Sequence, residues 1–236
     1  MRTVFNSLDI RTFFWYNENM KCFVIAMDKE AAPVIAQMSS VSEKIICGKK
    51  VVKGKLYGEK TAVLICGVGK VNAACGTQIA ISKFKPEAVI NLGVAGGLND
   101  GVRVGEIYAV SHAVQYDFDL TQLNGTQIGT LDECKENFLP LAVSRLYPLK
   151  KLATGDRFND SKEDFNLLTE TLSADIRDME GGAVAQVCMH AQVPCFAFKI
   201  ISDAAGSGST TEQYLNNLSL CFKTLSRELK NICNIG

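Results

Sequence analysis

Residues 21–38 are KCFVIAMDKEAAPVIAQM, and this stretch indicates the fold class. Cys22–Met27 is a continuous apolar run, which is typical of a strand that is buried on both faces. Asp28–Met38 follows at once and carries its apolar residues at helical spacing. Because a buried strand that passes directly into a helix is the repeating unit of α/β proteins, the stretch favours that class.

The alternation of strands and helices continues along the chain. Further strands are predicted at Val51–Tyr57, Thr61–Cys66, Ala88–Leu92, Val104–Val110, Ala113–Tyr116, Lys151–Thr154 and Phe196–Ile201. Further helices are predicted at Val71–Phe84, Ser161–Leu172, Glu180–Ala191 and Thr210–Ile232, and Asp117–Pro140 is expected to be loop. We therefore expect a single-domain α/β/α sandwich with a central mixed, largely parallel β-sheet.

Composition narrows the classes of function. The 236 residues contain 25 Lys and Arg against 25 Asp and Glu, with no basic block, so we expect neither a nucleic-acid partner nor an anionic membrane surface. The nine cysteines form no CxxC pair, and no histidine cluster accompanies them. We therefore predict buried free thiols, no disulfide framework, no catalytic metal and no cofactor.

The first residues differ from the rest. Residues 1–19 hold the only Trp and several other aromatics, but no apolar stretch long enough for a signal peptide or a membrane span. We interpret residues 1–19 as an extension of unknown role, with a short arm packed on a neighbour as the alternative, and place the domain at residues 20–236. The sequence thus predicts a soluble, cytoplasmic protein.

Polar segments follow four of the predicted strands, where wound α/β sheets bind their ligands. They are Ala26–Glu30, Gly93–Gly97, Asp178–Glu180 and Ile201–Asp203. Glu30, Glu180 and Asp203 could therefore converge on one pocket. Each acid alone is a weak signal, because Glu30 could be a solvated first-turn acid and Asp203 could be a helix N-cap.

Seven segments taken together are more specific than any one of them. They are AMDKEAAPVI, CGVGKVNAA, INLGVAGGL, VGEIYAVSHAVQYDFDLT, TGDRFND, DMEGGAVAQVC and FKIISDAAG. In order and spacing the chain resembles the 5′-methylthioadenosine/S-adenosylhomocysteine nucleosidases of the purine nucleoside and uridine phosphorylase superfamily, from about Met20 to Ile232. The resemblance implies hydrolysis of the N-glycosidic bond of 5′-substituted adenine nucleosides (methylthioadenosine, adenosylhomocysteine, 5′-deoxyadenosine) to adenine and the free sugar.

The resemblance also implies roles for the three acids. Asp203 matches the acid at purine N7, Glu30 the carboxylate that activates water, and Glu180 the group that holds the ribose 2′ and 3′ hydroxyls. Glycosidic cleavage in general needs an acid on the departing group and a base on the attacking water. One carboxyl must then stay protonated while another stays ionised.

Other substrate contacts are implied by the same resemblance. They are Met27, Val68, Val94, Ala95, Gly96, Phe158, Asn159, Met179 and Ser202, with Phe158 stacked on the base, Asn159 reaching the base edge through its backbone and Ser202 supporting Asp203. Leu120 and Leu123 match a loop that closes the pocket of a second subunit, which implies a homodimer.

Several departures from the family pattern keep alternatives open. Val94 stands where nucleosidases commonly carry Ser, and Val cannot donate a hydrogen bond. No arginine lies beside Gly67–Lys70 or Gly93–Gly97, which speaks against a phosphate site, although Arg157 and Arg177 lie near other motifs. After Asp203 the nearest residues to close a 5′ pocket are Thr211 and Tyr214. A phosphate-dependent nucleoside phosphorylase and a non-catalytic nucleoside-binding relative remain the alternatives.

Overall fold

The computed structural model describes residues 20–205 and 208–234, so the predictions for residues 1–19 lie outside the described residues. Its strands are β1 (Met20–Ile25), β2 (Met38–Ile46), β3 (Lys49–Leu56), β4 (Glu59–Ile65), β5 (Ala88–Gly97), β6 (Ile107–Gln115), β7 (Leu139–Pro140), β8 (Leu149–Thr154), β9 (Ile176–Asp178) and β10 (Cys195–Ala204). Its helices are α1 (Asp28–Ile35), α2 (Lys70–Phe84), α3 (Thr121–Asn124), α4 (Lys162–Asn166) continued by a π-helical turn at Leu167–Thr171, α5 (Gly181–Ala191) and α6 (Thr210–Cys233).

All the strands of the described residues belong to one mixed sheet, with the order β10-β6-β8-β9-β5-β1-β4-β3-β2 and β7 paired to β6. In the middle, β1 pairs in parallel with both β4 and β5. At one end β10 pairs in parallel with β5 and antiparallel with β6, so β10, β6, β8, β9 and β5 close into a ring. This closure brings the ends of β5, β9 and β10 together.

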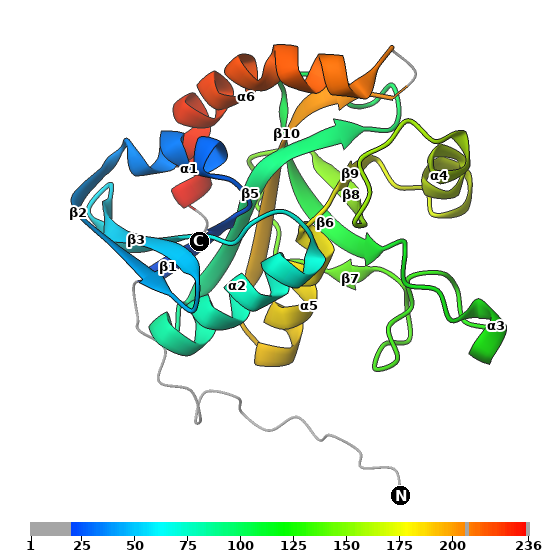
Figure 1. Cartoon of the computed structure of the whole chain (residues 1–236), viewed down its shortest axis with the longest axis horizontal. Helices are drawn as coiled ribbons and strands as arrows, with labels where there is room; N and C mark the ends of the chain where they lie inside the picture. The colour runs from blue at the N-terminus through cyan, green and yellow to red at the C-terminus, as the bar shows by residue number, and fades with distance from the viewer. Residues whose placement is uncertain (1–19, 206–207, 235–236) are drawn as a thin grey trace, which may run out of the picture.

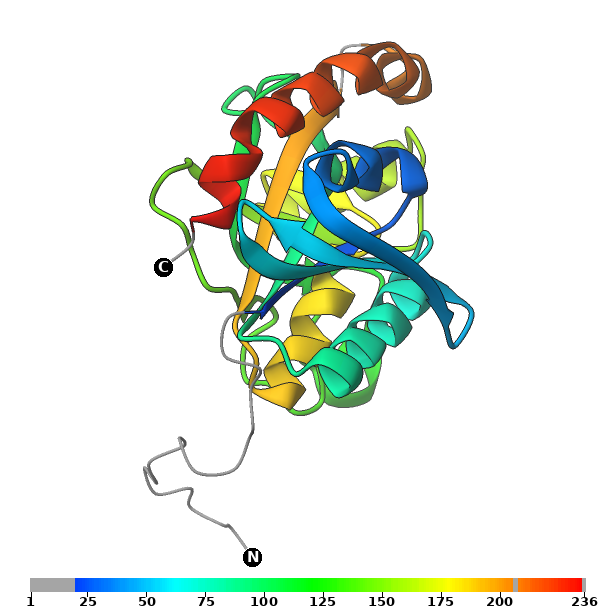
Figure 2. The ribbon, with the colours of Figure 1, turned by 90° about the vertical axis from the view of Figure 1, so that its left-hand side faces the viewer.

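Helices cover both faces of the sheet. Helices α2 and α5 pack against one face, whereas α1 and the long α6 pack against the other (Figures 1 and 2). Each layer has its own apolar core: Ala80 and Val184 belong to the first, and Val34 and Leu225 to the second. The predicted α/β/α class with a mixed central sheet is confirmed.

The strand and helix at residues 21–38 are as predicted except at the end of the helix. All six residues of β1 are buried, as expected for a strand covered on both faces. The prediction that the helix extends to Met38 is wrong, because α1 ends at Ile35 and Met38 begins β2. Strand β2 was missed because it is an exposed edge strand that pairs only with β3 and therefore needs no apolar alternation.

Most strand boundaries differ from the prediction by one or two residues, and three of the strands differ by more. Strand β5 continues through Gly97 and β10 through Ala204, because the two pair with each other along that length. The segments predicted to follow these strands are thus their last residues. The two strands predicted at Val104–Val110 and Ala113–Tyr116 form one strand, β6. The short strands β7 and β9 were not predicted. Within the described part of the chain, no helix is both long and apolar enough to cross a membrane.

Candidate active site

A cavity of about 450 Å³ lies where β1, β5, β9 and β10 end. It is lined by eleven of the residues named from the sequence: Met27, Glu30, Val68, Val94, Ala95, Gly96, Phe158, Met179, Glu180, Ser202 and Asp203. Its further lining residues are Ala26, Arg177, Asp178, Thr211, Tyr214 and Leu215. The lining brings together acids that are more than 170 residues apart in sequence.

Glu30 lies in the first turn of α1 and is buried, with 3% of its surface exposed. The alternative of a solvated first-turn acid is therefore excluded. The backbone amide of Val94 donates to Glu30 Oε1 at 3.0 Å, while Oε2 is buried without a hydrogen-bond partner among the described residues. Burial raises the pKa of Glu30, and the Val94 amide and the charge of Lys199 oppose that rise. An unpaired buried oxygen that lines a cavity is available to a ligand or to water.

Asp203 lies inside β10 with 2% of its surface exposed, so it is not a helix N-cap. The Ser202 hydroxyl donates to Asp203 Oδ1 at 2.7 Å. Burial raises the pKa of Asp203, against the opposing effects of that hydrogen bond and of the Arg177 charge. Gly96 gives this carboxyl its room, because a Cβ at Gly96 would stand 2.7 Å from Asp203 Oδ2.

Glu180 is the residue that precedes α5, and its carboxylate binds a neighbouring loop. The backbone amide of Gly69 donates to Glu180 Oε1 at 2.9 Å. Burial, followed by the nearby Asp178 carboxylate, raises the pKa of Glu180 from 4.5 to about 7. The other carboxylate oxygen of Glu180 has no hydrogen bond to the rest of the described chain and can accept from a ligand.

A buried ion pair supports the acids of the cavity. Lys199 Nζ lies 2.7 Å from Asp178 Oδ2, and Asp178 also accepts from the Thr154 hydroxyl at 2.6 Å and from the Gly181 amide at 2.8 Å. Burial alone would lower the pKa of Lys199, but the Asp178 and Glu180 carboxylates raise it. Lys199 is thus held as a cation behind the carboxylates.

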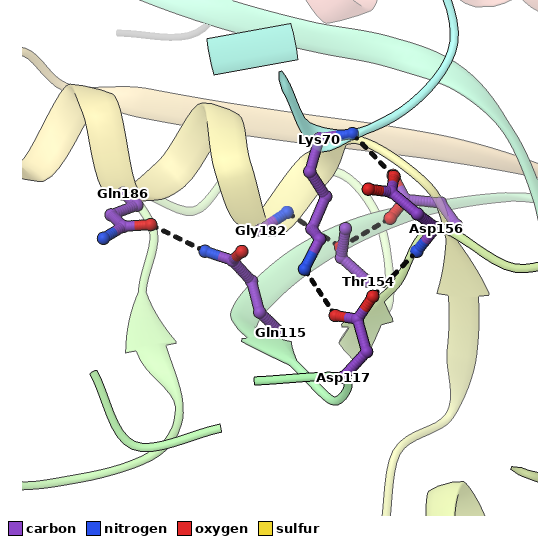
Figure 3. Close-up of polar contacts among 8 residues, drawn as sticks. Lys70, Gln115, Asp117, Thr154, Asp156, Gly182 and Gln186 are labelled. Carbon is purple, nitrogen blue, oxygen red and sulfur yellow. Dashed lines mark hydrogen bonds and ion pairs between the residues drawn. The ribbon is translucent and has the colours of Figure 1, made fainter. Parts of the chain in front are cut away.

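A second polar network fixes the loop that binds Glu180 (Figure 3). Lys70 opens α2 directly after Gly69; its backbone amide donates to Asp156 Oδ1 at 2.8 Å, and its ammonium forms an ion pair with Asp117. The backbone amide of Asp156 in turn donates to Asp117 Oδ2 at 3.0 Å. These contacts connect three loops: the one before α2, the one after β6 and the one after β8. They therefore hold the loop that carries the Gly69 amide in place.

Aromatic and aliphatic residues form much of the remaining wall of the cavity, together with Arg177 and Thr211. Phe158 and Tyr214 meet edge to face, with ring centroids 5.6 Å apart, and Tyr214 and Thr211 approach from the start of α6. Both residues had been named from the sequence as the nearest to close this side. Leu215, on the same helix, also lines the cavity and was not named from the sequence.

Three of the residues named from the sequence do not line the cavity. The Asn159 side chain donates to Asp164 Oδ2 at 2.9 Å and so takes part in the loop's own hydrogen bonds. Leu120 and Leu123 lie at helix α3, which projects from the body of the chain (Figure 1), and Leu123 is 79% exposed. Within residues 20–205 and 208–234 no cluster of three His, Cys, Asp or Glu side chains is arranged to hold a metal ion.

Replacing Glu180 by Gln should stabilise the fold above neutral pH. The folded-state pKa of Glu180 is raised from 4.5 to about 7, so the stability linked to its proton is complete below pH 4.5 and is lost as pH rises through 7. Gln has no proton to lose and still accepts from Gly69. We expect the variant to gain up to roughly 3 kcal/mol over the wild type between pH 5 and 8.

Denaturant unfolding at several pH values measures this gain. Glu43→Gln, at an exposed position, is the control for the chemical change alone. A stability difference between Glu180→Gln and the wild type that is the same at pH 5 and pH 8 would contradict the prediction.

Comparison with known proteins identifies relatives that match most of this chain in sequence. The family model of the phosphorylase superfamily matches residues 21–233. A 5′-methylthioadenosine/S-adenosylhomocysteine nucleosidase of Geobacillus kaustophilus is 35% identical over 213 residues, which cover 83% of this chain and 90% of that protein.

Solved structures show the same fold. Futalosine hydrolase of Helicobacter pylori matches with a TM-score of 0.84 at 24% identity, over 92% of this chain and 97% of that chain. The 5′-methylthioadenosine/S-adenosylhomocysteine nucleosidase of Helicobacter pylori, solved with butyl-thio-DADMe-Immucillin-A, matches with a TM-score of 0.83 at 25% identity, over 92% of this chain and 98% of that chain.

Proposed function

This chain belongs to the 5′-methylthioadenosine/S-adenosylhomocysteine nucleosidase family and is an N-glycosidic hydrolase, and from that premise we propose the substrate and the residue roles. The proposed substrates are 5′-substituted adenine nucleosides: methylthioadenosine, adenosylhomocysteine and 5′-deoxyadenosine. The products are adenine and the free sugar. The observation that carries the proposal is the pair of buried carboxyl groups, Glu30 and Asp203, on one cavity.

Asp203 is the proposed general acid at purine N7. Its enclosed position favours the protonated form, and Ser202 occupies Oδ1, which leaves Oδ2 to hold the proton that is donated. As the C1′–N9 bond breaks, its electron pair passes to the base, and protonation of N7 neutralises the developing anion. Phe158 and Met179 supply apolar surface against the base and the ribose.

Glu30 is the proposed general base. Its Oε2 has no partner in the described chain, so it can accept a proton from a water molecule placed beneath the ribose. The Val94 amide and the cation of Lys199 favour the ionised form that this role needs. Val94 contributes through its backbone, so the absence of a hydroxyl at this position does not remove the contact to Glu30.

Glu180 is the proposed ligand of the ribose 2′ and 3′ hydroxyls. Gly69 occupies one carboxylate oxygen, and the other lines the cavity. A carboxylate accepts hydrogen bonds from both hydroxyls of a diol, and this fixes the sugar relative to the two catalytic carboxyls.

We further propose a homodimer in which helix α3 reaches the partner's cavity. Leu123 is exposed on this projecting segment and offers apolar surface that the described part of its own chain does not cover, and Leu120 beside it is half-buried. Truncating both leucines to Ala should weaken the dimer and raise KM, as measured by sedimentation and by base release.

The test of the proposed reaction is base release by the purified protein. Methylthioadenosine, adenosylhomocysteine, 5′-deoxyadenosine, inosine and uridine are each incubated with and without phosphate, and free base is separated by chromatography. Phosphate-independent adenine release from the first three is the expected result. A strict requirement for phosphate would make the chain a phosphorylase, and tight binding without release would make it a nucleoside-binding protein.

Lys70→Met should weaken substrate binding through the loop that it fixes. Without the ion pair to Asp117, the Gly69 amide is less firmly placed against Glu180. We expect KM to rise about 3- to 10-fold, the scale of one hydrogen bond, with a smaller change in kcat. A 3′-deoxy substrate should lose less, because it lacks one of the hydroxyls that Glu180 binds.

The matched control is Lys150→Met. Lys150 is as little exposed as Lys70 and pairs with Asp175, away from the cavity. An equal rise in KM for both variants, or for both substrates, would contradict the positioning role of Lys70.

A further inference from the structure

Arg177 is a cation of the cavity wall that the proposed reaction does not use. It is the middle residue of β9, half-buried, and lines the cavity together with Asp203. Its neighbour Asp178 is held in the ion pair with Lys199. Arg177 forms no hydrogen bond or ion pair through its guanidinium with any residue in 20–205 or 208–234. Its donors are therefore available to a ligand.

Gly96 places Arg177 beside Asp203. Strand β9 pairs antiparallel with the end of β5, with Arg177 opposite Gly96. A Cβ on Gly96 would lie 2.7 Å from Asp203 Oδ2 and 3.3 Å from Arg177 Nε. The carboxyl and the guanidinium thus border the same space above a glycine, yet they are too far apart to pair with each other. A ligand edge with two polar atoms can meet both.

We propose that Arg177 recognises a carbonyl oxygen at C6 of the purine, so that the enzyme also cleaves 6-oxopurine nucleosides. The inference rests on the proposed function, in which Asp203 faces N7. On a purine the 6-substituent stands beside N7 on the same edge. Because Ser202 holds Asp203 Oδ1 and Oδ2 is directed at N7, the next protein group along that edge is Arg177.

The guanidinium of Arg177 distinguishes a 6-oxopurine from a 6-aminopurine. Arginine carries five N–H donors and no acceptor, so it can donate to a 6-oxo oxygen but cannot accept from a 6-amino group. An amino group facing Arg177 leaves both sets of donors without an acceptor. The contact therefore favours the 6-oxo base without excluding the 6-amino base, which binds without this hydrogen bond.

The same contact assists departure of the base. When the C1′–N9 bond breaks, its electron pair is delocalised over the purine, and for a 6-oxopurine part of the negative charge reaches O6. Asp203 gives its proton to N7, water forms the new bond to C1′, and Glu30 takes the proton that water loses. The positive charge of Arg177 at O6 stabilises the leaving group without transferring a proton, since arginine stays protonated.

The test compares two substrates that differ only at C6, 5′-methylthioinosine and 5′-methylthioadenosine. The wild type should release hypoxanthine from the first as well as adenine from the second. Arg177→Met keeps an unbranched side chain that reaches as far as the Nε position, but it removes the guanidinium with its charge and donors. It should lower the ratio of kcat/KM for the 6-oxo substrate over the 6-amino substrate by about 10- to 100-fold, the scale of a charge-assisted hydrogen bond.

Arg103→Met is the matched control, because Arg103 is largely exposed and lies outside the cavity. It should leave the ratio unchanged. Calorimetry adds a readout that needs no turnover: hypoxanthine should bind the wild type more tightly than Arg177→Met, whereas adenine should not.

The outcomes distinguish failure of the inference about Arg177 from failure of the proposed function. Release of both bases with a ratio that Arg177→Met leaves unaltered overturns the inference and leaves the proposed function standing. Release of adenine but not hypoxanthine by the wild type also overturns the inference and leaves the proposed function standing. Release of neither base overturns the proposed function; calorimetry then still decides on Arg177, because equal hypoxanthine affinity in wild type and variant removes its role.

Discussion

Asp203→Asn is expected to lower kcat for adenine release about 10²- to 10⁴-fold, the usual contribution of one general acid. The change removes the proton that N7 receives but keeps the size of the side chain and the Oδ1 acceptor for Ser202. Substrate affinity should therefore change little, and the variant should form a stable complex with methylthioadenosine. Single-turnover base release and equilibrium binding, measured on the same preparation, separate the two effects.

The pH profile gives this prediction a second test. Burial raises the pKa of Asp203, so the wild-type rate should stay high as pH rises until this carboxyl loses its proton, and then fall. In Asp203→Asn that alkaline limb should disappear. Asp132→Asn, at an exposed position before β7 and outside the cavity lining, is the control and should keep both the rate and the profile. A variant with the wild-type rate would exclude Asp203 as the acid.

The sequence predicts the buried strands well because their constraint is local. A strand covered on both faces, such as β1 or β10, is built mostly of apolar residues, and such a run is visible in one sequence. The exposed edge strand β2 and the three-residue strand β9 carry no such run, since their positions depend on partners far away in the chain. Pattern alone therefore cannot find them.

In the candidate site, too, the residues with a local sequence signal could be predicted, whereas those whose position depends on distant partners could not. Glu30 could be named because it closely follows a buried strand and lies inside a family motif, and Asp203 because it lies near the end of a buried strand inside another. The position of Arg177 over Gly96 follows from the pairing of β9 with β5, which is set by the closure of the sheet ring. The turned side chain of Asn159 likewise depends on Asp164, a partner that no motif indicates.

The buried lysine shows how the site keeps several acids together. Asp178 pairs with Lys199, and the charge of Lys199 also acts to lower the pKa of Glu30 and of Glu180. One cation does not balance three carboxylates, so the cavity favours protonation of some of them. Such a mixture of protonated and ionised carboxyls is what glycosidic cleavage needs.

Glu30→Gln is expected to lower kcat about 10²- to 10⁴-fold as well, because no other described group has a free buried oxygen at that side of the cavity to activate water. Gln keeps an acceptor for the Val94 amide, so the loop at the end of β5 should hold its position. The acid limb of the pH profile, where Glu30 gains a proton and can no longer act as a base, should disappear. This limb should lie above the ordinary range of glutamate because burial raises the pKa of Glu30.

Asp28→Asn, two residues earlier in the first turn of α1 but exposed, is the control for changes to the helix itself. It should keep the wild-type kcat. If Glu30→Gln kept the rate and Asp28→Asn lost it, the water would be activated from outside the cavity and the unpaired Oε2 would have another purpose. If both kept the rate, departure of the base alone would limit turnover, and the whole catalytic effect would fall on Asp203 and the groups around it.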